Sequence, residues 1–552
     1  MSEDRPHILI IGGSGVFGSR LARLLARRQR YRVTLGGRDG EKAAALQPEL
    51  RGLDPQGEFG FAALDREQLS PERLDEIAAD VVVDAAGPFR ADSTKVIEAA
   101  IAAGCAYVDL ADNRAFVAGV PRFDLAAKKA GVVVVTGAST TPALTHAVLR
   151  SLTEGWLDID SVDVAIVPGN KTPKGPAVIG SILSWVGKKV AVFEEGQWQD
   201  RRGWSAMRPV LIEGIGRRRA AIAEVPDLDL MQARFKPRVR AGFRAGMELG
   251  LLNGLIGLAG LAVRLRLARS ATVFTGLGTK IAEALGAFGS DSGGMVVEAA
   301  GRDSRGEARL TRWSLAATKG DGPYVPAIAA AALVEAIVER RGPHSGAYVA
   351  AGLVSLDDIR PWFEGLNVEA KSSTFRNEKP LYRLVIGPDF EQMPAPTRRL
   401  HRGRPAVTAE GEADILGASN VLGGAIARLA GLPPHGSRVP LRVVIESREG
   451  REYWARFFGG RPMRSVMRRV GDGLLEERFG PVAVRMTLEA RKDGLNMIRH
   501  SGRLFGIPLP RALLPRIRAE ERVDDNGRHR FDVEIGLPLV GRLVAYSGYL
   551  RV

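Results

Sequence analysis

The chain of 552 residues contains a single cysteine, Cys105, which excludes an internal disulfide framework and a zinc site built from cysteines. Its first residues, "MSEDRPHILI", lack the apolar core and the cleavage site of a signal peptide. No apolar run reaches the roughly 20 residues that a membrane-spanning helix needs. We therefore expect a cytoplasmic protein.

The sequence also lacks a long polar segment, a repeat of 20 to 50 residues and a basic-aromatic RNA-binding motif. We therefore expect a chain that folds throughout and has no nucleic-acid partner. The net charge of +15 leaves open an anionic membrane surface, a phosphorylated ligand or simply an arginine-rich composition. The length exceeds that of one compact domain, so several domains are expected.

A glycine motif near the N-terminus is the clearest functional signal that is present. Gly13, Gly15 and Gly18 form G-x-G-x-x-G between the strand-like "HILII" and the helical pattern "VFGSRLARLLARR". One glycine permits a tight turn, the next lets a pyrophosphate approach the backbone, and the third lets the helix pack on the strand. The expected cofactor-binding residues of this loop are Gly12, Gly13, Ser14, Gly15, Val16, Phe17 and Gly18.

The end of the second strand indicates which dinucleotide binds. An NAD site carries a carboxylate there, but "RVTLGGRDGEKAA" places Gly36, Gly37 and Arg38 at this point, with Lys42 one helical turn on. A guanidinium group suits the 2′-phosphate of NADP. NADP is therefore the expected cofactor, although the neighbouring Asp39 keeps NAD open.

Further strand-helix units continue to about residue 154. The strand-like segments "FGFAAL", "DVVVDAAGPF", "AYVDLAD" and "GVVVVTGAS" are separated by stretches of helix length. This alternation predicts an α/β fold, with a doubly wound parallel sheet of the Rossmann type over residues 1–154.

The order of "VVVDAAGPFR", "VIEAAIAAGCAYVDLADN" and "TGASTTPAL" resembles the NADP-binding domain of the saccharopine dehydrogenase-like oxidoreductase family. On this resemblance, Gly87, Pro88 and Phe89 line the cofactor, as does Asp65 after the preceding strand. Asp109 and Asp112 then become the candidate catalytic residues. The alternative for both aspartates is a helix cap, and for Gly87–Pro88 an ordinary turn.

The resemblance does not extend to the substrate. The sequence shows no arginine and lysine arrangement for the carboxylates of saccharopine, and no tyrosine stands four residues before a lysine, as a short-chain dehydrogenase would require. His146 follows "TTPAL" in an expected helix, where it either reaches the cleft or stays in the interior.

Residues 155–390 are expected to form an α+β substrate or dimerisation domain with an antiparallel sheet covered by helices. Its segment 249–263, "LGLLNGLIGLAGLAV", is apolar and flanked by arginines. Three interpretations remain open for it: a buried or homodimer-interface helix, peripheral contact with an anionic membrane, and a true membrane span.

A third domain, residues 396–552, is expected to be mostly antiparallel β structure, with "DDNG" as a turn. The segments "EYWARFFGG", "GIPLPRALLPRIRAEE" and "LPLVGRLVAYSGYL" resemble a domain of unknown function that follows saccharopine dehydrogenase-like domains in bacteria. Its aromatic and charged residues predict either core with cross-strand pairs or a cupped sheet that holds an apolar ligand.

Two functions therefore compete. One is an NADP-dependent oxidoreductase that acts on a small, apolar or lipid-like substrate other than saccharopine. The other is a nonenzymatic NADP-binding protein with a regulatory or membrane-associated role, which the lack of an identifiable proton donor favours.

Overall fold

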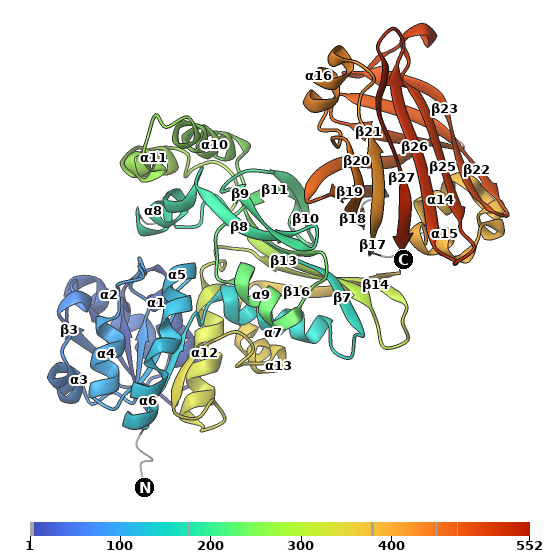
Figure 1. Cartoon of the computed structure of the whole chain (residues 1–552). Helices are drawn as coiled ribbons and strands as arrows, with labels where there is room; N and C mark the ends of the chain where they lie inside the picture. The colour runs from blue at the N-terminus through green and yellow to red at the C-terminus, as the bar shows by residue number, and fades with distance from the viewer. Residues whose placement is uncertain (1–4, 174–175, 377–379, 404, 449, 472) are drawn as a thin grey trace.

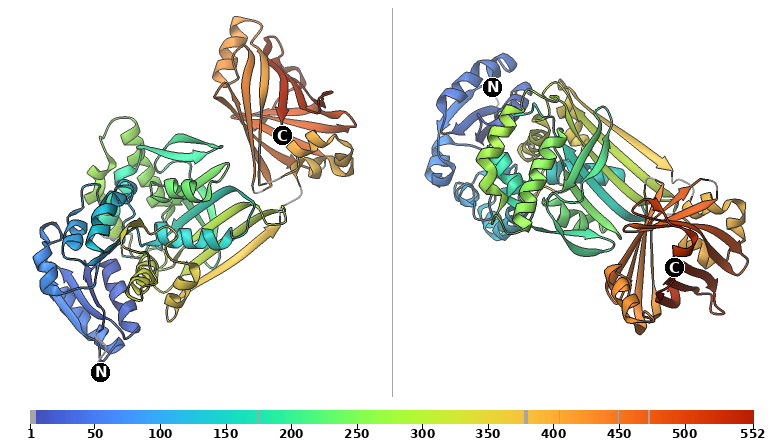
Figure 2. Two further views of the ribbon diagram at one scale, coloured as in Figure 1. Left: turned by 60° about the horizontal axis from the view of Figure 1, so that its bottom comes forward. Right: turned by 90° about the horizontal axis from the view of Figure 1, so that it is seen from above.

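Three structural units lie in a row in the computed structural model of the chain, with the N-terminal unit at one end and the C-terminal unit at the other (Figures 1 and 2). The structure describes residues 5–173, 176–376, 380–403, 405–448, 450–471 and 473–552.

The N-terminal unit is built on a parallel sheet of seven strands in the order β15-β6-β5-β4-β1-β2-β3. Its strands are apolar on both faces because helices cover both sides of the sheet. This is the expected doubly wound architecture. The strands are β1 (His7–Ile11), β2 (Arg32–Gly37), β3 (Phe59–Ala63), β4 (Val81–Asp84), β5 (Ala106–Asp109), β6 (Val133–Thr136) and β15 (Gly346–Val349).

Helices α1 and α12 lie against one another beside this sheet, and α12 is apolar around most of its circumference because it is buried on nearly every side. The helices of this unit and of its boundary with the middle unit are α1 (Val16–Arg27), α2 (Gly40–Leu53), α3 (Pro71–Ile77), α4 (Lys95–Ala102), α5 (Arg114–Gly119), α6 (Asp124–Ala130), α7 (Thr145–Leu152), α12 (Tyr324–Val338) and α13 (Leu356–Ile359).

The middle unit has a mixed sheet of nine strands, in which β10-β11-β12-β7-β13-β14-β16 form the main path and β8 pairs with β12 and β9. The expected antiparallel pairing holds except between β7 and β12, which run parallel. A long crossover containing β8–β11 and α9 connects these two strands, and only such a connection allows parallel neighbours. The strands are β7 (Asp158–Val167), β8 (Lys189–Glu194), β9 (Gln197–Arg202), β10 (Arg208–Ile212), β11 (Gly216–Ile222), β12 (Arg240–Ala245), β13 (Gly293–Arg302), β14 (Ala308–Ala317) and β16 (Val368–Arg376).

Helices α8, α10 and α11 form a layer on the outer side of the middle sheet, away from α7 and α9 (Figure 1). The helices of this unit are α8 (Pro176–Trp185), α9 (Asp227–Phe235), α10 (Gly250–Arg264) and α11 (Thr275–Ala284). None of the helices in the described part of the chain is long and apolar enough to cross a membrane.

The C-terminal unit is an antiparallel sheet of eleven strands that closes into a barrel, because β22 pairs with both β21 and β23. The strands are β17 (Ala406–Leu416), β18 (Gly436–Arg448), β19 (Arg451–Phe458), β20 (Arg461–Val470), β21 (Leu474–Phe479), β22 (Val482–Arg491), β23 (Gly494–Leu504), β24 (Ile507–Pro508), β25 (Arg516–Val523), β26 (His529–Leu537) and β27 (Gly541–Arg551). Its helices are α14 (Leu381–Ile386), α15 (Ala395–Leu400) and α16 (Val421–Leu429).

Candidate functional site

The glycine loop follows β1 and holds its shape through β2. The backbone N–H groups of Gly12 and Gly13 donate to the Gly36 carbonyl, at 2.8 and 3.2 Å, and Gly12 has a φ of +75°. A Cβ atom on Gly18 would lie 2.2 Å from the Gly12 carbonyl oxygen, so this glycine lets α1 pack against the loop. The backbone of the glycine loop therefore packs directly against the backbone of β2 and of α1.

The N-terminus of α1 is open to a ligand. Its N-cap is Gly15, an exposed residue that supplies no side-chain cap, and its first turn carries no acidic residue. The first N–H groups of the helix thus keep their hydrogen-bonding capacity and the positive end of the helix dipole is uncompensated. Ser14 and Val16 flank this position, and Phe17 points toward the middle unit, where it lines a cavity.

Arg38 lies just beyond β2 and is exposed; none of the described residues forms a hydrogen bond or ion pair with it. The neighbouring Asp39, in contrast, makes two contacts with Lys42. It caps α2 by accepting from the backbone N–H of Lys42 at 3.1 Å, and its other oxygen lies 2.9 Å from the Lys42 ammonium group. Both contacts lower the pKa of Asp39.

The loops after β3 and β4 reach the same edge of the sheet, because the strands are parallel. Asp65 is half-buried and caps a short 3-10 turn through the N–H of Glu67. Gly87 and Pro88 are exposed, but Phe89 is buried against Phe116, with ring centroids 5.3 Å apart. The Phe89 side chain therefore belongs to the core beside the loop.

Arg66 and Asp84 form a buried ion pair at this edge that the sequence analysis missed. The Arg66 Nε atom donates to the Asp84 carboxylate at 2.7 Å, and the guanidinium group lies 4.9 Å from the centroid of the Phe89 ring. Burial raises the pKa of Asp84, and the positive charge of Arg66 opposes that rise. Nothing in the spacing of these two residues along the chain signals their contact.

Asp109 ends β5 and is fully buried. Its Oδ1 atom accepts hydrogen bonds from the N–H groups of Ala111 and Gly137 and from the Thr136 hydroxyl, at 2.8–2.9 Å. Burial raises the pKa of Asp109 to about 7 despite these donors. The carboxyl group thus ties the β5 and β6 loops together from inside.

His146 lies in α7 and is also fully buried. Burial lowers the pKa of His146 to about 3, so the ring is neutral. One of its nitrogens lies 4.0 Å from the Asp227 carboxylate, which accepts a short hydrogen bond from Thr145. His146 does not reach a cleft and belongs to the interior.

Asp112 lies at a cavity of about 240 Å³ between the carboxyl edge of the parallel sheet and the middle unit. Asn113, Arg114 and Thr141 line it from the N-terminal unit, and Ile166 and Phe243 line it from β7 and β12. Asp112 is exposed, and desolvation by the surrounding residues raises the pKa of its carboxyl group.

Glu224 is a second carboxyl group at this cavity, and the sequence analysis did not identify it. Burial raises the pKa of Glu224, with Arg114 as the strongest opposing charge. Arg114 is itself held by Asp229 and by the Ala191 carbonyl oxygen. Glu224 comes from the loop after β11, so only the fold brings it to Asp112.

Two apolar cavities adjoin the first. One, of about 180 Å³, shares Ile166 and Ile182 with it and is lined by Phe17 and Thr140. The other, of about 310 Å³, shares Ile182 and Met247 with the second cavity and is walled by α8, α10 and α11. The two apolar cavities together thus extend from the N-terminal end of α1 to the layer formed by α8, α10 and α11.

The described residues contain no group of three His, Cys, Asp or Glu side chains placed to hold a metal ion.

Comparisons with known proteins match both terminal units. Residues 8–135 match the family model described as the saccharopine dehydrogenase NADP binding domain, and residues 393–550 match a domain of unknown function, DUF4166. Both resemblances expected from the sequence are thereby confirmed. No curated protein matches the chain.

Solved structures with similar parts include an amine dehydrogenase from Mycobacterium smegmatis. The two chains are 13% identical, and the match covers 64% of this chain and 97% of the amine dehydrogenase, at a TM-score of 0.37. Another is an alcohol dehydrogenase from the archaeon Thermococcus sibiricus, in complex with 5-hydroxy-NADP. It is 17% identical and covers 24% of this chain and 77% of its own length at a TM-score of 0.19.

Proposed function

Because the N-terminal unit matches an NADP-binding domain family, we propose that the protein is an NADP-dependent oxidoreductase. The proposal rests on where the candidate binding and catalytic residues lie in the fold. The open N-terminus of α1, the exposed Arg38 and the cavity with Asp112 and Glu224 all belong to the carboxyl edge of one parallel sheet. Ligands of doubly wound sheets bind at this edge.

In this proposal the residues of the glycine loop, 12–18, hold the pyrophosphate through backbone N–H groups at the start of α1. Arg38 and Lys42 face the 2′-phosphate of NADP. Asp39 already caps α2 and pairs with Lys42, so it is a poor partner for the ribose hydroxyl group that an NAD site binds. Asp65, Gly87 and Pro88 line the remaining length of the cofactor. NAD is the alternative cofactor, and titration with NADPH and NADH distinguishes the two.

The cofactor supplies a hydride at its C4 atom. The chain has to orient the substrate and supply or accept one proton, because reduction of a C=O or C=N bond adds a hydride to carbon and a proton to the heteroatom. Glu224 and Asp112 suit this role, since both line the cavity and desolvation raises the pKa of each carboxyl group, which favours its proton-carrying form. Asp109 is buried and acts as a positioning residue for the β5 and β6 loops.

The cavities favour an apolar, lipid-like substrate. The cavity walled by α8, α10 and α11 is lined by Ile, Leu, Met, Phe, Ala and Gly residues, and the cavity lined by Phe17 adds Pro, Val and Thr. On the outside of this helix layer, Leu251, Leu258 and Leu277 are about three-fifths exposed; Arg264 ends α10, and Arg266 and Arg269 follow it. Peripheral contact of α10 and α11 with an anionic membrane is therefore part of the proposal, and a second copy of the chain is the other occupant of this face.

A nonenzymatic NADP-binding protein with a regulatory or membrane-associated role is the second candidate. The burial of Asp109, the residue that the family resemblance suggested for catalysis, favours it.

The experiment that separates the two is NADPH absorbance, followed while imines, keto lipids and enoyl lipids are added. If the protein is an oxidoreductase, the NADPH absorbance should fall when a substrate is added. A Glu224→Gln variant should then bind NADPH normally but have a kcat at least tenfold lower. Glu154→Gln, on an exposed carboxylate, is the matched control and should be unchanged. NADPH binding without turnover of any class would favour the second candidate.

A further inference from the structure

The interior of the C-terminal barrel contains a cavity of about 80 Å³. Apolar side chains from almost every strand line it, among them Met467, Met486 and Met497, whose flexible thioethers adapt to different shapes. Tyr382 from α14 and Leu400 from α15 also line it. This site is separate from the dinucleotide edge and does not depend on the function proposed above.

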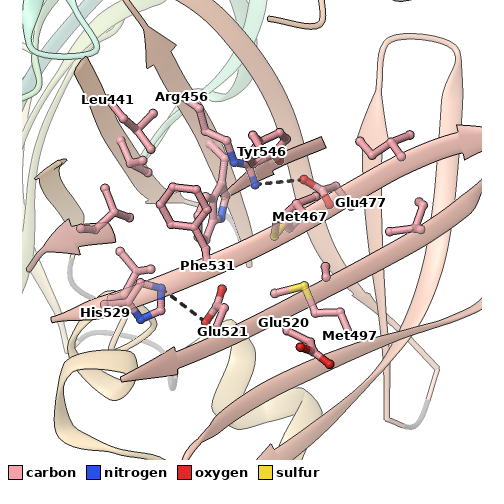
Figure 3. Close-up of a pocket in the computed structure, with 18 of the residues that line it drawn as sticks. Leu441, Arg456, Met467, Glu477, Met497, Glu520, Glu521, His529, Phe531 and Tyr546 are labelled. Carbon is pink, nitrogen blue, oxygen red and sulfur yellow. Dashed lines mark hydrogen bonds and ion pairs between the residues drawn. The ribbon is translucent and has the colours of Figure 1, made fainter. Parts of the chain in front are cut away.

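The charged groups around this cavity are paired with one another. Arg456 donates to Glu477 at 3.2 Å and to the Ser465 hydroxyl at 3.0 Å, and Figure 3 shows Arg456 and Glu477 pointing toward each other. On the other side, Glu521 lies 2.7 Å from a ring nitrogen of His401 and 3.8 Å from one of His529. A charged ligand would have to compete with these ion pairs.

The hydroxyl group of Tyr546 is different. Tyr546 is 7% exposed, lines the cavity and packs its ring against Phe458 and Phe531. Figure 3 shows it beside Arg456 and Glu477, yet no described residue forms a hydrogen bond with its hydroxyl group. Burial raises the pKa of Tyr546 to about 12, so the hydroxyl group keeps its proton and is a free donor.

The barrel wall opens next to this cavity. Strands β23 and β25 pair only between residues 494–497 and 519–522, and beyond Met497 the two strands separate. A second cavity, of about 570 Å³, lies along this gap and shares Met497, Ile517, Ala519 and Glu520 with the interior cavity. Its lining is mixed: Arg499, Arg516, Arg518 and Arg542 face it together with Glu520 and Glu534, beside the exposed Ile498.

We propose that the barrel binds an uncharged, mostly apolar ligand with one hydrogen-bond-accepting oxygen, which enters through the gap between β23 and β25 and accepts from Tyr546. The apolar lining supplies affinity by burial, and the free donor at Tyr546 supplies selectivity. The interior cavity holds only a short part of such a molecule, so the remainder of a longer chain extends along the gap. Within the interior cavity a carboxylate is disfavoured, because Arg456 is already paired with Glu477 and His401 with Glu521.

The test uses the full-length protein without NADPH and the fluorescent probe 1-aminoanthracene, displaced by 2-decanone, decanoate or decane. We expect 2-decanone to displace the probe at lower concentration than either of the others. Tyr546→Phe should weaken displacement by 2-decanone about three- to tenfold, as loss of one neutral hydrogen bond does, and leave that by decane unchanged. Such a selective loss is not expected from a purely structural role of Tyr546.

A pair of phenylalanine substitutions locates the site. Ala519→Phe fills the shared wall of the two cavities and should abolish probe binding, whereas Thr487→Phe adds the same ring on the exposed face of β22 and should not. Thermal unfolding confirms that each variant is folded; if Ala519→Phe does not fold, Val533→Phe, on another wall, replaces it. The proposal is overturned if the wild-type protein does not bind the probe, if the folded filling variant binds it normally, or if decanoate competes best.

Discussion

Gly15 and Gly18 lie in the same loop, but a side chain would meet different surroundings at each. A Cβ atom at Gly15 has only the Gly12 carbonyl oxygen nearby, at 3.0 Å, whereas one at Gly18 would lie 2.2 Å from it. Gly15→Val should therefore fold but lose NADPH binding by at least tenfold, because its side chain occupies the pyrophosphate position. Gly18→Val should unfold at a clearly lower temperature, because helix and loop cannot both keep their places.

Thermal unfolding and NADPH titration of the two variants check this. A folded Gly15→Val variant that binds NADPH normally would place the cofactor elsewhere, and the wild-type protein at the same concentration is the control.

Asp109 gives the N-terminal unit a defined pH dependence. Its pKa is about 7 when folded and has its ordinary value of 3.8 when unfolded. Between these values the folded state keeps a proton that the unfolded state releases, so stability present below pH 4 is lost as the pH rises toward 7. Asp109→Asn cannot lose a proton, and its amide oxygen accepts the same hydrogen bonds. The fall in melting temperature between pH 5 and pH 8 should be smaller for this variant than for the wild-type protein.

Scanning calorimetry at several pH values measures this difference. Asp227, whose pKa is also about 7, retains its own share of the pH dependence in the variant. Equal slopes for the two proteins would mean that Asp109 is ionised in the folded state.

At this scale, the sequence predicted the glycine loop and identified Asp112 as a candidate catalytic residue, but it did not indicate Glu224 at the same cavity. Gly13, Gly15 and Gly18 act within one turn, so their spacing alone carries the signal. Glu224 and Asp112 line one cavity although more than a hundred residues separate them, and the pKa of each is raised by burial that only the fold creates. Local reasoning also could not show that the Asp109 side chain points inward.

Helix α10 presents an apolar face outward. Leu251 and Leu258 are more than 60% exposed, while Asn253 is buried and bonds both the N–H and the carbonyl group of Met247. Replacing both leucines with serine should abolish flotation of the protein with anionic vesicles while leaving NADPH binding intact, because these side chains supply the apolar contact. Flotation on a density gradient measures the change in vesicle binding.

Neutral vesicles and high salt are the controls for this experiment. The arginines after α10 contribute about 1 kcal/mol each near an anionic surface, so salt should weaken the wild-type interaction. A chain that floats with neither vesicle and forms dimers in light scattering would assign the face to a second copy instead.

The length of the apolar segment 249–263 predicted a helix too short to span a membrane, and the structure confirms a helix at Gly250–Arg264. Which face of this helix is exposed to solvent could not be predicted from the sequence. Apolar and glycine residues make up nearly all of α10, so only its packing on the rest of the middle unit shows which of its leucines remain exposed.

The barrel contacts the middle unit through a buried ion pair. Arg240 on β12 lies 2.6 Å from Asp163 and 2.5 Å from Glu446 on β18. Glu446→Ala should destabilise the arrangement of the two units by about 3 kcal/mol, because the buried Arg240 loses one of its two partners. Arg464→Ala, which removes the more exposed pair with Glu195, should cost less than about 1 kcal/mol.

Limited proteolysis in increasing urea compares the two variants, with release of the barrel as the readout. Equal resistance of the two variants would contradict the assignment of Glu446 as the stronger contact.

At the scale of the whole molecule, strand patterns predicted the parallel and antiparallel units but not their long-range connections. Strand β15 returns to the first sheet from residues 346–349, and the barrel closes only because its first strand, β17, pairs with its last strand, β27. Both pairings join elements whose own sequences say nothing about their neighbours. The cavity in the barrel follows from that closure.

The most direct measurement of the central claim is calorimetric titration of the wild-type protein and Arg38→Ala with NADPH and NADH. The account predicts tighter binding of NADPH to the wild-type protein. It also predicts a loss of NADPH affinity of roughly tenfold or more in Arg38→Ala, as removal of a charged hydrogen bond causes, with NADH affinity unchanged. Binding of NADH at least as tight as that of NADPH, or the same ratio of affinities in both proteins, would contradict it.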